Sequence, residues 1–233
     1  HALRIALNAN LQAGRWQDAL KVVRVLEKRR ALHPVLARRL KLAAYRERLE
    51  AQRFDPTSLE QAWNEIPAAD RENPDIALAG ARLLNLAGRG GLAAAAIEAA
   101  LGTEPAAWDD GAGRLLEEYA RAQAFPARIQ LERVEAWIEK AAPETGVHAS
   151  LLRVGGLLCL REQLWGKAAS YLKESLQIAP EAGTLLALAR LAEAVGDEAQ
   201  AATQFREAAL AYARQGATEI ADSTLRTQLD QEP

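Results

Sequence analysis

ASLLRVGGLLCLREQLWGKAASYLKESLQIAP, residues 149–180, contains two helix-forming stretches separated by a short polar break and closed by a proline. The next stretch, residues 181–210, repeats this pattern, and Ala168 corresponds to Ala201, 33 residues further on. A repeat of this length with glycine, small-residue and proline punctuation is typical of stacked helical hairpins. The sequence therefore predicts an array of helix-turn-helix units.

The same pattern extends over the rest of the chain. A small residue is expected near the start of each second helix, because a large Cβ substituent would push the two helices of a hairpin apart. These positions are Ala19, Ala62, Ala93, Leu131, Ala168 and Ala201, of which Leu131 breaks the rule. Glycines that can adopt positive φ are expected to end first helices. They are Gly14, Gly88 and Gly196.

The repeats predict a tetratricopeptide-like fold in one domain, residues 1–233. We expect an all-α, right-handed superhelix of about six hairpins, the first five of which are each closed by a proline that cannot continue the preceding helix. The expected hairpins cover residues 1–34, 35–74, 75–105, 106–143, 149–180 and 182–215. A terminal helix at 216–230 is expected to cap the open apolar face of the last hairpin.

Composition argues against several classes of protein. Aromatic residues are 5% of the chain, no stretch alternates like a β-strand, and no apolar run approaches the roughly 20 residues of a membrane-spanning helix. The single cysteine, Cys159, excludes an internal disulfide. Three scattered histidines offer no nucleophile, base or metal set, and Gly88 to Gly91 follow no strand, so they indicate a turn. We predict a non-enzymatic protein without a metal.

Charge is unevenly distributed. Residues 1–53 contain 13 Lys or Arg against 4 Asp or Glu, whereas the remaining residues contain 16 against 27. The basic region is open to three interpretations: a solvated surface, a patch facing anionic phospholipid, or a nucleic-acid footprint. Nucleic acid is disfavoured because only Trp16 and Tyr45 could stack near the cations. The predicted membrane-facing patch is Lys28, Arg29, Arg30, Arg38, Arg39 and Lys41.

A solenoid of hairpins supplies a concave groove lined by the first helix of each unit. Helical periodicity predicts that mostly cationic side chains line it, and arginine suits partners that carry carboxylates. The predicted partner-binding positions are Arg4, Asn8, Arg82, Asn85, Arg153, Leu157, Arg161 and Arg190.

Three stretches resemble the C-terminal tetratricopeptide region of the HemY family. They are LERVEAWIEK (131–140), LLCLREQLWGKAASYLKESLQ (157–177), in which Leu-Trp-Gly-Lys-Ala (164–168) is the most specific element, and more loosely AWNEIPAADRENP (62–74). The resemblance implies a bacterial inner-membrane protein associated with late haem biosynthesis, with this region on the cytoplasmic side. It also implies membrane-spanning helices ahead of the repeats and haem-biosynthesis enzymes as partners.

Two functions are therefore expected from different classes. The first is an interaction scaffold that recruits proteins through its groove without any cofactor. The alternative is a porphyrin or haem carrier or regulator, for which His33, His148, Cys159 or Tyr171 would supply axial ligands.

Overall fold

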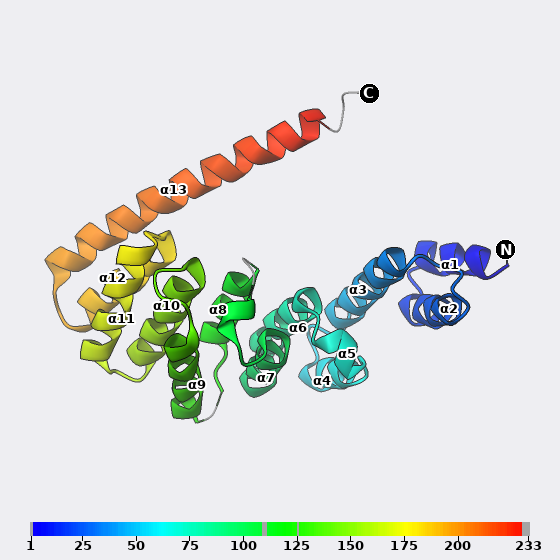
Figure 1. The fold of residues 1–233 in the computed structure, drawn as a ribbon, viewed down its shortest axis with the longest axis horizontal. Helices are drawn as coiled ribbons and strands as arrows, with labels where there is room; N and C mark the ends of the chain where they lie inside the picture. The colour runs from blue at the N-terminus through cyan, green and yellow to red at the C-terminus, as the bar shows by residue number, and fades with distance from the viewer. Residues whose placement is uncertain (1, 109–110, 125, 230–233) are drawn as a thin grey trace. The chain divides into compact units, whose positions relative to one another are not determined.

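The computed structural model describes residues 2–108, 111–124 and 126–229. Within these residues the chain forms thirteen α-helices and one short 3₁₀ turn, and no strand, which confirms the all-α class (Figure 1). The helices pack into two compact units: His1–Glu104 with Gly111–Phe125, and Pro105–Asp110 with Pro126–Pro233. The interpretation of the chain as one domain stays a prediction.

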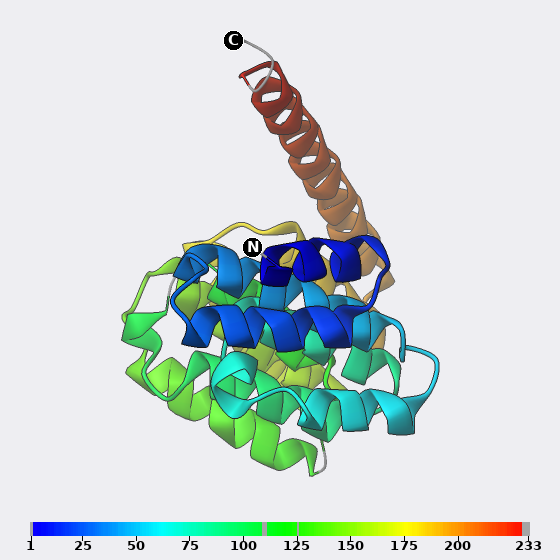
Figure 2. The ribbon, with the colours of Figure 1, turned by 90° about the vertical axis from the view of Figure 1, so that its right-hand side faces the viewer.

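Unit 1 is built from consecutive antiparallel hairpins. The first hairpin shows two helices running side by side (Figure 2). The next two hairpins follow in the same order, and α8 then packs on both helices of the third. The helices are α1 (Ala2–Gln12), α2 (Trp16–Lys28), α3 (Pro34–Glu50), α4 (Pro56–Asn64), α5 (Ala68–Arg71), α6 (Pro74–Leu86), α7 (Gly90–Leu101) and α8 (Ala112–Arg121).

Prolines begin three of these helices, because the first helical position needs no N–H donor. Helix α3 starts at Pro34 and α6 at Pro74, where the sequence predicts hairpin boundaries. Asn73 caps the N-terminus of α6, because its side-chain oxygen accepts hydrogen bonds from the backbone amides of Asp75 and Ile76. The short helix α5 is not predicted by the repeat pattern.

Unit 2 contains the two most regular hairpins. Its elements are the 3₁₀ turn η1 (Pro105–Ala107), α9 (Ala127–Lys140), α10 (Gly146–Arg161), α11 (Trp165–Ile178), α12 (Ala182–Ala194) and α13 (Glu198–Leu229). Helix α10 pairs with α11 and α12 pairs with α13, while α9 packs against α10. A Cβ built on Gly156 would lie 2.5 Å from Leu172 Cγ, so α10 and α11 cross closely only because glycine stands there.

The predicted hairpin positions are partly rearranged. Helix α8 belongs to unit 1 and α9 to unit 2, so the expected fourth hairpin, which contains Leu131 instead of a small residue, is divided between the units. The expected separate cap at 216–230 is wrong, because α13 continues through Gly216 as one 32-residue helix. An isolated glycine costs about 1 kcal/mol in a helix, which is too little to end one rich in alanine and glutamate.

The turns inside hairpins share one hydrogen-bonded geometry. Gly14, Gly88 and Gly196 adopt φ values of 64°, 71° and 81°, which confirms the positive φ predicted for them. The fourth such turn places Gln163 at φ 59°. In this turn the Leu164 amide donates to the Cys159 carbonyl at 2.9 Å, a bond that closes a Schellman motif.

Gln163 therefore occupies a position that favours glycine. We expect Gln163→Gly to raise the free energy of unfolding by about 0.5–1 kcal/mol, because removal of the left-handed Cβ penalty outweighs the added flexibility of the unfolded chain. Urea unfolding followed by circular dichroism measures the change. Gln163→Ala is the control, since it keeps the strained Cβ and should leave stability nearly unchanged; equal gains in both variants would contradict the backbone explanation.

Candidate partner-binding groove

A groove of about 660 Å³ lies in unit 1, across α3, α6 and α8. Helices α3 and α6 are the first helices of the second and third hairpins, so the groove occupies the face on which the repeat pattern places partner binding. Its lining consists of Arg39, Leu42, Ala43, Arg46, Glu50, Asp75, Leu78, Ala79, Arg82, Leu83, Leu86 and Arg114.

Helical spacing explains why these side chains share the groove. On α3 the lining residues Arg39, Leu42 and Arg46 follow one another at intervals of three and four, which keeps them on one face. On α6 the lining residues Leu78, Arg82 and Leu86 follow one another at intervals of four, which keeps them on one face over about two turns. Each helix therefore contributes one stripe that combines arginine with leucine.

The groove carries an excess of positive charge. Four arginines face two carboxylates, Glu50 and Asp75. Within the described part of the chain, Arg39, Arg46 and Arg114 are exposed and form no ion pair. Their guanidinium groups are thus available to a ligand that carries carboxylates.

The fourth arginine already holds a carboxylate of the protein. Arg82 Nε lies 3.4 Å from Glu118 Oε1, and Glu118 is a buried residue of α8 with a side chain that is 4% exposed. Asn85 Nδ2 donates to the Glu118 carbonyl at 3.0 Å, and Arg121 pairs with the same carboxylate. These contacts fix α8 on α6, so the groove surface that these two helices contribute is held in place.

Of the four arginines in the groove, one comes from each predicted set and two come from neither. Arg82 was predicted for partner binding, and Arg39 was predicted to face a membrane. Sequence reasoning did not select Arg46 or Arg114 as site residues. Arg46 could have been identified from its spacing, because it follows Arg39 by seven residues, about two turns of α3, and therefore lies on the same face.

Two of the three predicted groove cations of unit 2 are engaged within the protein. Arg153 is buried in α10, with Nη2 3.4 Å from Glu181 Oε2. Arg161 Nη2 donates to Gln130 Oε1 of α9 at 2.8 Å. Leu157 is half-buried and Arg190 is exposed on α12. Two of these cations therefore tie helices of unit 2 together.

The remaining predicted positions lie near the start of unit 1. Arg4 Nη2 donates to the Ala31 carbonyl at 3.1 Å, and Asn8 is exposed on α1. In the predicted membrane-facing patch, Lys41 Nζ lies 3.2 Å from a Glu27 oxygen and 3.5 Å from an Asp70 oxygen. The exposed members of the patch are Lys28, Arg29, Arg30, Arg38 and Arg39.

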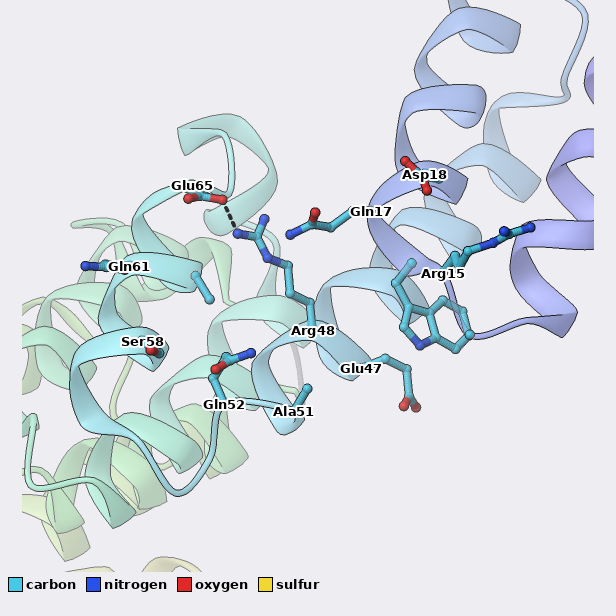
Figure 3. A pocket seen from close by; sticks show the side chains of 13 residues that line it. Arg15, Gln17, Asp18, Glu47, Arg48, Ala51, Gln52, Ser58, Gln61 and Glu65 are labelled. Carbon is cyan, nitrogen blue, oxygen red and sulfur yellow. Dashed lines mark hydrogen bonds and ion pairs between the residues drawn. The ribbon is translucent and has the colours of Figure 1, made fainter.

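A second pocket of about 490 Å³ lies at the turns of the first two hairpins. Figure 3 shows Arg48 reaching from α3 toward Glu65, with which it forms an ion pair, while Gln17 lies nearby. The lining contains two cations, Arg15 and Arg48, and three carboxylates, Asp18, Glu47 and Glu65. A pocket whose charges offset one another offers less selectivity for a charged partner than the arginine-rich groove.

The side chains considered as haem ligands are dispersed. His33 is exposed in unit 1, while the other three lie in unit 2. His148 and Cys159 are both buried in α10 but stand three turns apart, about 16 Å along the helix axis. Tyr171 donates to Glu135 at 3.3 Å. Across the residues with described positions, no three His, Cys, Asp or Glu side chains gather as a metal site.

Cys159 lies in an environment that suppresses its reactivity. Burial raises the pKa of its thiol to about 11, against a smaller opposing effect of the Lys167 charge. At pH 8 we expect only about one molecule in a thousand to carry the thiolate, so labelling by a disulfide reagent should be at least about a hundredfold slower than in the unfolded chain. Absorbance of the released thiol, with and without guanidinium, checks this; equal rates would contradict it.

None of the described helices has the length and apolar character needed to cross a bilayer. No protein-family model matches the chain, and no curated protein matches it.

Proposed function

We propose that this protein is a non-enzymatic interaction scaffold that recruits partner proteins through the groove on α3, α6 and α8. The observation that supports this function best is the groove itself, in which exposed arginines from three helices surround leucine side chains. Consecutive hairpins that present a continuous face are suited to binding extended or helical segments of other proteins.

The resemblance of residues 131–140 and 157–177 to the HemY family suggests the cellular location and the partners of this scaffold. We propose a tetratricopeptide-like superhelix that forms the part outside the membrane of an anchored bacterial protein, in which it assembles enzymes of late haem biosynthesis. The basic region of residues 1–53 would then lie nearest an anionic bilayer surface.

Site-specific photocrosslinking in native membranes tests the scaffold. A photoreactive amino acid is placed at Ala43, an exposed groove position, and at Ala95, an exposed position on the second helix α7. Partner proteins should crosslink at Ala43 and not at Ala95, and mass spectrometry identifies them. Crosslinks confined to Ala95, or the absence of any protein crosslink at Ala43, would refute recruitment through the groove.

A further inference from the structure

We propose that the groove on α3, α6 and α8 recognises an acidic amphipathic helix, one with carboxylates along one edge and leucine-like side chains beside them. This inference rests on the proposed function and specifies the chemistry of the partner. It depends on two features of the lining, the arrangement of its cations and the apolar surface between them.

The cations are arranged to match a helical ligand. Arg39 and Arg46 stand seven residues apart on α3, about 10 Å along its axis, and carboxylates seven residues apart on a ligand helix have the same separation. Arg114 adds a cation from α8. A carboxylate side chain already pairs at this face, since Arg82 binds Glu118 of the protein itself. Additional carboxylates are therefore compatible with the chemistry of the lining.

The apolar surface requires more than charge from the partner. Leu86 is 84% exposed at the edge of the groove, although a leucine gains about 1.5–3 kcal/mol on full burial. Leu42 and Leu83, which line the same groove, are half-buried and add to the surface for apolar side chains. A polyanion without apolar groups would leave this surface in water.

The lining disfavours a nucleic acid. Its twelve residues include no aromatic side chain on which a base could stack. Nucleic acids and anionic vesicles also carry negative charge, so the experiment compares their affinity for the protein with that of the peptide.

Fluorescence anisotropy on the full chain tests the proposal with a labelled dodecapeptide, ELAELLEELAEL, whose leucines share one helical face and whose glutamates include pairs seven residues apart. A version with every leucine replaced by alanine, a dodecamer of thymidylate, and vesicles of phosphatidylglycerol serve as comparison ligands. We expect the leucine peptide to bind most tightly and to lose affinity as salt is raised, because the exposed ion pairs are screened. Tighter binding of the oligonucleotide or the vesicles would overturn the inference.

Matched variants locate the site. Arg39→Ala/Arg114→Ala removes two cations that pair with no residue in the described part of the chain and should weaken the leucine peptide about tenfold, whereas Lys28→Ala/Arg29→Ala should change it less than about twofold. Leu86→Ala should weaken the leucine peptide about fivefold and leave the alanine peptide unchanged, with Leu210→Ala as the control at another exposed leucine. Equal effects of test and control variants would overturn the assignment.

The two proposals fail in different ways. Crosslinking of partners at Ala43 without binding of the leucine peptide would support the scaffold function and refute the proposal that its ligand is an acidic helix. Peptide binding that depends on Arg39 and Arg114, without any crosslink in membranes, would support the chemistry of the groove and refute the scaffold role.

Discussion

Gly90→Ala should lower the free energy of unfolding of unit 1 by about 3 kcal/mol, the upper range for overpacking of a close contact. A Cβ at this position would stand 2.5 Å from the backbone nitrogen of Gln123 and 2.7 Å from its carbonyl carbon and oxygen. Backbone atoms cannot move aside as the end of a flexible side chain can. The segment after α8 must therefore shift away from the start of α7.

The adjacent glycine provides a matched control. A Cβ on Gly91 would meet nothing within 4 Å, so Gly91→Ala should leave stability unchanged or raise it by as much as about 0.5–1 kcal/mol. Urea unfolding followed by circular dichroism measures both variants, and hydrogen exchange over residues 90–101 locates the change. Similar stabilities for the two variants would show that contact with Gln123 does not restrict position 90.

The same change should reach the groove. Gln123 follows α8, which supplies Arg114 and Glu118, so displacement of this segment disturbs one wall of the site. We expect Gly90→Ala to weaken binding of the leucine peptide as well as stability. The glycine-rich stretch at residues 88–91 thus combines two structural requirements: a positive φ at Gly88 and close backbone packing at Gly90.

Local chemistry made much of the helical order predictable. Gly14, Gly88 and Gly196 mark turns because glycine adopts left-handed backbone conformations without a Cβ clash. Pro34 and Pro74 mark helix starts because proline lacks the N–H that an interior helical position would donate. These effects act within a few residues. They do not depend on which helices later become neighbours.

The composition of the candidate site depends on contacts between distant residues. Arg153 and Arg161 fit the same sequence pattern as Arg82, and all three pair within the protein. The side chains of Arg153 and Arg161, which bind Glu181 and Gln130, are only 9% and 28% exposed, whereas that of Arg82 is 54% exposed. Sequence periodicity identifies the face of a helix but not the partner that occupies it. Helix α13 differs from these arginines, because the helix propensity of its alanines and glutamates outweighs the cost of Gly216, and the sequence prediction gave that glycine too much weight.

Glu118→Gln should lower the free energy of unfolding of unit 1 by about 2 kcal/mol. The change removes the charge that Arg82 and Arg121 stabilise and places an amide in a site that is 4% exposed. The two guanidinium groups are more than half exposed and can turn to water, which limits the loss. Asn85 keeps its bond to the Glu118 carbonyl, so α8 should remain on α6.

Glu132→Gln is the control for losing a carboxylate that binds arginine. Glu132 accepts from Arg128 Nε at 2.8 Å, but both side chains are more than half exposed, so we expect a change of less than about 0.5 kcal/mol. Urea unfolding of both variants checks the difference. A loss at Glu132 equal to that at Glu118 would show that burial does not set the strength of these pairs.

Peptide binding separates the structural role of Glu118 from the binding role of the groove. Glu118→Gln removes one negative charge beside Arg82, so the groove becomes more attractive to carboxylates while unit 1 becomes less stable. We expect the affinity for the leucine peptide to rise about threefold at low salt, and this rise to vanish at high salt. If affinity instead falls together with stability, Glu118 is needed to orient Arg82 toward the ligand. Combining the change with Arg82→Ala decides between these two roles, because the rise should disappear when the released guanidinium is absent.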